Sequence, residues 1–128
     1  MKALLDTHVF LWWNTNDPRL SPAAHEVIAE GQNELFVSVA SAWEIAIKVG
    51  RGSLILPEPP ELYVPDRLKL HHFRILPIRL EQALRVHGLP DIHRDPFDRL
   101  LIVQSQFEDL PILTNDAAIA RYDVNVIW

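Results

Sequence analysis

The pattern of hydrophobic and polar positions along this chain predicts a regular alternation of strands and helices. Short apolar runs bounded by turn residues predict buried strands. These runs lie at residues 2–5, 35–39, 73–78, 112–114 and 124–128. Apolar residues spaced three or four apart predict helices between the strands. These helices lie at residues 7–13, 22–30, 40–49, 66–71, 80–87, 96–107 and 117–122.

Local signals mark the ends of two of these helices. Ser21 and Pro22 supply an N-cap followed by proline at the first helical position, and Gly31 is suited to the stop. Asp95 and Pro96 repeat the same start before a strongly apolar helix. The segment between the second and third strands is different, because its prolines at 57, 59, 60 and 65 predict a loop that leads into a short helix.

Strands that alternate with helices favour a parallel sheet covered by helices on both faces. We therefore predict an α/β fold, a three-layer α/β/α sandwich with a mostly parallel central sheet. A chain of 128 residues without a linker-like segment is predicted to form one domain, residues 1–128.

Composition narrows the class of protein. Hydrophobic residues make up 48% of the chain and charged residues 23%, as in ordinary folded proteins. No apolar run approaches the ~20 residues of a membrane span, and the six residues up to Asp6 are too few for a secretory signal. We expect a cytoplasmic protein that is not bound to a membrane.

Several chemistries lack the residues that they need. Without cysteine there is no disulfide, thiol nucleophile or thiolate metal site. Phosphate-binding glycine loops and the nucleophile elbow G-x-S-x-G are also missing. The net charge of −5 argues against a broad basic surface for nucleic acid. An enzyme that meets phosphates through a bound metal ion escapes that argument, because the ion neutralises its acids.

Four carboxylates occupy positions that a parallel fold would bring together. Asp6 and Asp116 follow predicted strands, whereas Glu44 and Asp98 belong to predicted helices. Functional groups in such folds gather outside the carboxyl ends of the strands. Acids that converge repel one another, and a hard divalent cation with oxygen ligands relieves the repulsion. The set predicts a metal site of Asp6, Glu44, Asp98 and Asp116.

Each acid also has a purely structural explanation. Asp6 and Asp116 could cap the helices that follow them, and Asp98 stands at the third position of its helix, where an acid suits the positive end. Glu44 could form a capping box with Ser41. The metal-site hypothesis depends on the four acids taken as a set.

Several other polar residues are candidate substrate contacts. Lys48 and Arg51 share a helical face with Glu44, where they form either an exposed ion pair or a contact to phosphate. The remaining candidates are Thr7, Arg99 and Thr114. Arg99 points about 100° away from Asp98 around the helix, so it pairs with another acid or flanks the substrate.

The six histidines lack the spacing of a metal-binding motif such as H-E-x-x-H. We therefore assign them to surface or loop positions. For His93 and Arg94, which precede the Asp95 cap, a structural role in the turn is favoured over contact with a phosphate.

Four stretches of the sequence carry a resemblance to a known family. They are LLDTHVFLWW, FVSVASAWEIAIKVGRGSLILP, LPDIHRDPFDRLLIVQSQ and LPILTNDAAIARY, and they are spread along the chain from residue 4 to residue 122. The chain is similar to the PIN-domain family, most closely to the VapC-type toxin ribonucleases of toxin–antitoxin pairs. The family's metal-binding acids match Asp6, Glu44, Asp98 and Asp116, and its polar residue before the last acid matches Thr114.

The resemblance implies a Mg²⁺- or Mn²⁺-dependent endoribonuclease that cuts RNA, for example tRNA. It also implies an antitoxin protein as partner and a homodimer. Asp6 and Asp98 would hold the principal ion, with Glu44 and Asp116 completing its shell or a second site. Two rival hypotheses use the same fold: a non-catalytic module that binds an antitoxin-like partner, and a metal-dependent DNA nuclease or phosphatase.

Overall fold

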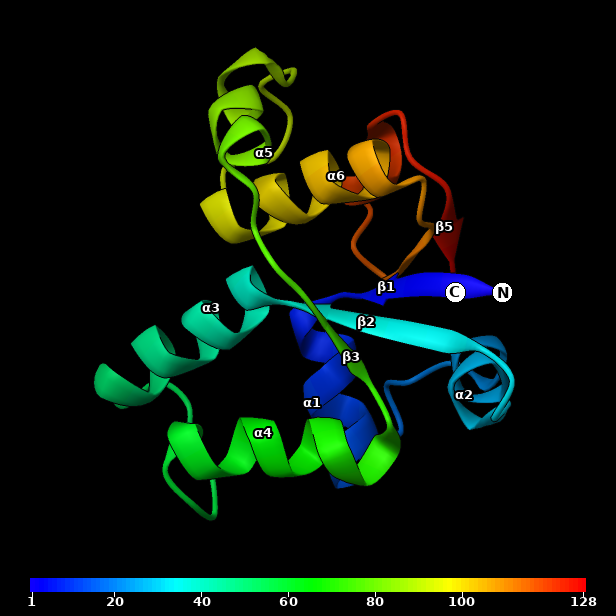
Figure 1. Cartoon of the computed structure of the whole chain (residues 1–128), viewed down its shortest axis with the longest axis vertical. Helices are drawn as coiled ribbons and strands as arrows, with labels where there is room; N and C mark the ends of the chain where they lie inside the picture. The colour runs from blue at the N-terminus through cyan, green and yellow to red at the C-terminus, as the bar shows by residue number, and fades with distance from the viewer.

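A parallel sheet forms the centre of the molecule. The computed structural model describes residues 1–128. The strands are β1 (Lys2–Leu5), β2 (Glu34–Ser38), β3 (Arg74–Leu76), β4 (Ile112–Leu113) and β5 (Val126–Ile127). Their order across the sheet is β3-β2-β1-β4-β5, and every neighbouring pair is parallel. The first strand of the chain therefore lies in the middle of the sheet (Figure 1).

The order of the strands reverses at β1. Strands β2 and β3 lie on one side of β1, whereas β4 and β5 lie on the other. Leu4 of β1 pairs with Phe36 of β2, and Leu5 of β1 pairs with Leu113 of β4. In an open parallel sheet, such a reversal leaves a crevice outside the carboxyl ends of the strands. A functional site is expected beyond Leu5 and Leu113.

Helices cover both faces of the sheet. They are α1 (Thr7–Thr15), α2 (Pro22–Ala29), α3 (Val39–Gly50), α4 (Pro60–His71), α5 (Leu80–Arg85) and α6 (Pro96–Glu108), with the 3-10 helices η1 (Val86–Gly88) and η2 (Ile119–Arg121). Helices α1, α2 and α4 lie on one side of the sheet, and α5 and α6 lie on the other (Figure 1). The predicted three-layer α/β/α sandwich is confirmed, and its sheet is parallel throughout. None of these helices combines the length and hydropathy that crossing a bilayer requires.

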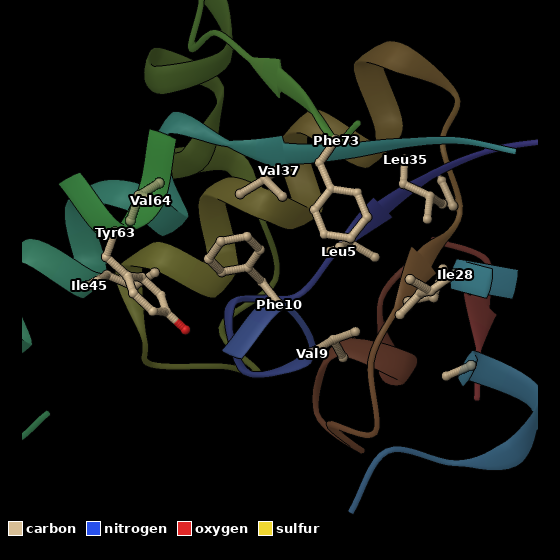
Figure 2. Packing of buried hydrophobic residues seen from close by; sticks show 13 residues of the cluster. Leu5, Val9, Phe10, Ile28, Leu35, Val37, Ile45, Tyr63, Val64 and Phe73 are labelled. Atoms are coloured by element: carbon tan, nitrogen blue, oxygen red, sulfur yellow. The ribbon is translucent and has the colours of Figure 1, made fainter. Parts of the chain in front are cut away.

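Two apolar clusters hold the layers together. The larger one packs α1, α2 and α4 against one face of the sheet, with Phe10 and Phe73 near its centre (Figure 2). The smaller one packs α6 and η2 against the other face through Leu101, Ile112 and Ile119. Because β1 contributes Leu5 to the first cluster and Leu4 to the second, the strand is buried on both faces. This explains the unbroken apolar run at the start of the sequence.

The helix before the third strand is longer than predicted. Residues 66–71 were expected to be helical, but α4 begins at Pro60 and contains Pro65. Pro60 stands in the first turn, where the missing N–H costs nothing, whereas Pro65 removes one backbone hydrogen bond. Burial of Tyr63 and Val64 in the larger cluster offsets that loss. Counting prolines therefore gave the wrong boundary.

Other boundaries differ by smaller amounts. Helix α3 starts at Val39 because Ser38 is its N-cap and accepts a hydrogen bond from the backbone N–H of Ala40. The predicted strand 73–78 is reduced to β3, and the predicted helix 117–122 is reduced to the short η2. The two C-terminal strands contain only the residues that pair in the ladder between β4 and β5.

Candidate metal centre

The four predicted acids come from four different elements. Asp6 directly follows β1, and Asp116 lies three residues beyond β4. Glu44 lies in α3 and Asp98 in the first turn of α6. Asp6, Glu44 and Asp98 are buried, whereas Asp116 is half-buried. The strand reversal at β1 places Asp6 and Asp116 beyond the carboxyl ends of neighbouring strands, the position at which ligands bind in open parallel sheets.

A buried threonine connects the ends of β1 and β4. The Thr114 hydroxyl donates to Oδ2 of Asp6 over 2.6 Å, and its oxygen accepts the backbone N–H of Asp116 over 3.0 Å. The other carboxylate oxygen of Asp6 accepts the backbone N–H of His8, so Asp6 also caps α1. Thr114 is completely buried and both of its functions are used inside the protein, which fits a structural role better than the expected substrate contact.

Thr114→Val removes this hydroxyl while keeping the size of the side chain. We expect the free energy of unfolding to fall by about 1–3 kcal/mol, because the buried Oδ2 of Asp6 loses its donor. Chemical denaturation measures the change. Thr114→Ser is the control, since it keeps the hydroxyl. Equal stability of the valine variant and the wild type would contradict this role.

Asp98 and Asp116 meet at the ring of a histidine. Nε2 of His93 lies 2.8 Å from Oδ2 of Asp116 and 3.0 Å from Oδ2 of Asp98. One ligand atom from each of these three residues can be chosen so that all lie within 4.8 Å of one another. The sequence interpretation gave His93 a role in the turn, and its Nδ1 does accept the backbone N–H of Asp95. The sequence interpretation did not predict the contact of His93 with the two acids, because these three residues form no motif of fixed spacing.

Glu44 presents an unsatisfied oxygen to the interior. Its side chain is 2% exposed, and Oε2 accepts a hydrogen bond from Nζ of Lys48 over 2.7 Å. Oε1 is buried and has no hydrogen-bond partner. A capping box with Ser41 is excluded, because the N-cap is Ser38 and the Ser41 oxygen accepts the Thr7 hydroxyl. A buried carboxylate oxygen without a donor is costly unless another group neutralises it.

The carboxylates influence one another's protonation. Burial raises the pKa of Asp98 to about 8, and the negative charges of Asp6, Asp95, Glu44 and Asp116 act in the same direction. Burial also raises the pKa of Asp6, although the Thr114 hydroxyl opposes this shift. The four acids are therefore close enough to repel one another. Without a cation, the cluster retains protons at neutral pH.

Two further shifts come from direct contacts. Burial acts to raise the pKa of Asp116, but the hydrogen bonds from His93 and from the backbone N–H of Ala118 outweigh burial and lower it. The hydrogen bond to Glu44 raises the pKa of Lys48, which keeps this ammonium group charged beside the cluster.

These groups fit a hard divalent cation. The cluster supplies several carboxylate oxygens, its mutual repulsion needs a positive charge, and Oε1 of Glu44 lacks a partner. Mg²⁺ and Mn²⁺ prefer oxygen ligands of this kind. The structure therefore has an acidic cluster that could bind a metal ion.

The remaining sequence candidates lie in different surroundings. The Thr7 hydroxyl is buried and donates to Ser41, which directs it into the protein. Lys48 is half-exposed next to Glu44, and Arg51 is exposed just beyond the end of α3. Only these two basic residues remain available to a substrate phosphate among the five candidates for substrate contact.

Arg99 is directed away from the acids. Its guanidinium donates to the backbone carbonyls of Val86, Leu89, Pro90 and His93. These bonds occupy the donors that a substrate phosphate would need. Arg99 therefore holds the loop before α6, and we do not assign it to the substrate.

Comparison with known proteins gives the same class that the fold and the acids define. A family model described as PIN domain matches residues 3–125. Ribonuclease VapC22 of Mycobacterium tuberculosis is 31% identical over 114 residues, which cover 88% of this chain and 85% of VapC22. Ribonuclease VapC16 of the same organism is 43% identical over 56 residues, which cover 41% of this chain and 40% of VapC16. The chain belongs to the PIN domain family, among its VapC-type members.

Solved structures agree on the fold. VapBC2 from Rickettsia felis, in a structure bound to a DNA fragment from its promoter, superposes with a TM-score of 0.71 at 14% identity. The match covers 98% of this chain and 97% of that one. A toxin–antitoxin complex from Klebsiella pneumoniae gives a TM-score of 0.60 at 16% identity, covering 98% and 96% of the two chains. At these identities the likeness concerns the fold alone.

Proposed function

We propose that this protein is an endoribonuclease that uses Mg²⁺ or Mn²⁺ to hydrolyse phosphodiester bonds in RNA. The observation that carries the proposal is the buried acid cluster at the strand reversal, in which Oε1 of Glu44 has no partner and Asp98 holds a proton at neutral pH. Both features fit a site that takes up a cation. The ribonuclease relatives VapC22 and VapC16 support RNA as the substrate.

The four acids and Thr114 have different roles in this proposal. Asp6 and Asp98 would hold the principal ion, and Glu44 and Asp116 would complete its surroundings or form a second site. A bound divalent ion supplies an acidified water and stabilises the charge that grows on the phosphate. Thr114 holds Asp6 in place, and a carboxylate of the cluster orients the attacking water as general base. Hydrolysis by water activated in this way would leave a 5′-phosphate and a 3′-hydroxyl.

Two basic residues, one on α3 and one at its C-cap, complete the proposed substrate site. Lys48 neutralises Glu44 and keeps its charge, because its hydrogen bond to that acid raises its pKa. Arg51 is exposed one turn further along the helix. We propose that the positive charges of both residues attract the RNA phosphates that flank the cleaved bond. Such attraction would guide RNA toward the acid cluster in spite of the cluster's negative charge.

The solved structures with the same fold suggest which proteins this chain binds. We propose a cognate antitoxin protein that neutralises the nuclease, since solved neighbours of this fold are VapBC2 and a toxin–antitoxin complex. We also propose that residues 1–128 act as one domain, that the protein forms a homodimer, that it works in the cytoplasm, and that structured RNA such as tRNA is cut.

One assay separates this function from its rivals. The purified protein is incubated with RNA, single-stranded DNA or a small phosphoester, each with Mg²⁺ and with EDTA. We expect cleavage of RNA only, dependent on Mg²⁺ and lost in EDTA. DNA cleavage or phosphoester hydrolysis at a comparable rate would favour the alternative nuclease or phosphatase. No metal-dependent turnover on any substrate would favour a non-catalytic binding module.

A further inference from the structure

His93 lies between the acid cluster and the backbone of its own loop. Its side chain is 15% exposed, and each ring nitrogen has a contact inside the protein. Nε2 faces the carboxylates of Asp98 and Asp116, at 3.0 and 2.8 Å. Nδ1 lies 3.1 Å from the backbone nitrogen of Asp95. An imidazole at such a place can serve as a metal ligand or as a hydrogen-bond donor, and the two roles need opposite proton positions.

The contact with Asp95 decides between the two roles. A backbone N–H can only donate, so Nδ1 of His93 must accept and carries no proton. The proton of the neutral ring is then on Nε2, which points at the two carboxylates. A protonated Nε2 has no lone pair for a metal ion. In this geometry the ring donates to Asp116, and its Nε2–H lies 3.0 Å, measured from Nε2, from the carboxylate of Asp98.

The loop that carries His93 is fixed from several directions. The backbone N–H of His93 donates to the Tyr122 hydroxyl over 2.7 Å, and that hydroxyl donates to the carbonyl of Pro90 over 2.8 Å. Arg99 donates to the carbonyls of Pro90 and His93. Tyr122 is itself buried in the smaller apolar cluster. Packed elements therefore fix the backbone of the loop that carries the imidazole.

We infer that His93 is a positioning residue, which holds Asp98 and Asp116 side by side through its Nε2–H and is not a ligand of the ion. The inference rests on the proposed function, because it assumes that these two acids bind a metal. The Nε2–H lies between Asp98 on α6 and Asp116 beyond β4. The side chains of these two acids form no hydrogen bond with each other. Holding two ligands in advance lowers the cost of ordering them when the ion binds.

Two substitutions of His93 test this role. Mn²⁺ binding to the whole protein is measured by calorimetry. His93→Ala removes the donor, and we expect binding to weaken about 10- to 100-fold, the range for residues that orient metal ligands. His93→Gln restores an N–H donor of similar reach, and we expect it to recover most of the lost affinity. His87→Ala, at an exposed histidine of η1, is the matched control and should bind as the wild type does.

A measurement on the unaltered protein avoids any question of folding. Nitrogen–proton correlation spectra of the imidazole rings distinguish the two tautomers in the wild-type protein without metal. We expect His93 to carry its proton on Nε2 and none on Nδ1. A proton on Nδ1 would overturn the inference, because it would leave Nε2 free to bind a metal ion.

The binding results separate this inference from the function on which it rests. Loss of Mn²⁺ binding in both the alanine and the glutamine variant would indicate that His93 is a ligand of the ion. Unchanged Mn²⁺ affinity of the alanine variant would show that His93 does not contribute to metal binding. Either result overturns the inference while the metal site stands. If the wild-type protein itself binds no Mn²⁺, the proposed function fails first.

Discussion

Asp98→Asn is expected to reduce Mg²⁺-dependent RNA cleavage at least about 100-fold while leaving the fold intact. Residues that merely orient metal ligands already cost 10- to 100-fold when they are changed, and Asp98 is proposed to bind the ion itself. The fold should survive, because an amide of the same shape replaces a carboxyl group whose pKa of about 8 keeps it mostly protonated in the metal-free protein. Cleavage rates and circular dichroism measure the two effects.

Asp109→Asn provides the matched control for this substitution. Asp109 follows the other end of α6 and is exposed. Its backbone has φ of 53°, a left-handed conformation that asparagine tolerates well. We expect this variant to cleave RNA as the wild type does. Undiminished cleavage by Asp98→Asn would remove Asp98 from the proposed metal site, and we expect Asp6→Asn to behave as Asp98→Asn does.

The metal-free protein is expected to lose stability as the pH rises from about 4 to about 8. Burial raises the pKa of Asp98 from 3.8 to about 8, so between these values the folded state binds more protons than the unfolded state. Stability then decreases with pH, by up to about 5 kcal/mol across the window. The raised pKa of Asp6 acts in the same direction. The lowered pKa of Asp116 takes effect only below pH 3.8, where its contribution is lost on acidification.

Chemical denaturation at a series of pH values, with EDTA and with Mg²⁺, measures this dependence. Asp98→Asn should flatten the curve, because the group that gains the proton is gone. Mg²⁺ should restore stability at the upper end of the window, by about 2.7 kcal/mol at a concentration 100 times its Kd. A stability that rises with pH in EDTA would show that the acids do not repel one another in the folded protein.

The placement of Asp6 and Asp116 beyond neighbouring strand ends could be predicted because it depends on topology. Asp6 and Asp116 follow strands that are apolar throughout, and parallel strands place their carboxyl ends at one edge. The start of α6 was equally clear from Asp95 and Pro96, and Asp95 does cap that helix. Sequence patterns with a fixed period or a fixed cap therefore gave both the layers of the fold and the elements that carry the cluster.

The parts that could not be predicted depend on contacts between distant segments. The loop that carries His93 is held partly by Tyr122, 29 residues away in sequence, whose hydroxyl accepts the backbone N–H of His93. Thr7 is a polar residue of a type that is common at protein surfaces, yet its hydroxyl donates a hydrogen bond to Ser41 in the interior. The length of α4 was missed for a related reason, since burial of its apolar residues outweighs the loss at Pro65. Rules based on residues that are close in sequence do not predict contacts with partners so far away along the chain.

The central place of β1 has a consequence for protein synthesis. Strand β1 leaves the ribosome more than a hundred residues before β4, and the edge of β1 that pairs with β4 stays unpaired until then. Asp6 then gains the Thr114 hydroxyl, and Asp116 joins His93 and Asp98. A partly translated chain would lack these groups. The proposed nuclease would therefore be inactive toward the messenger that encodes it until Asp116 has left the ribosome.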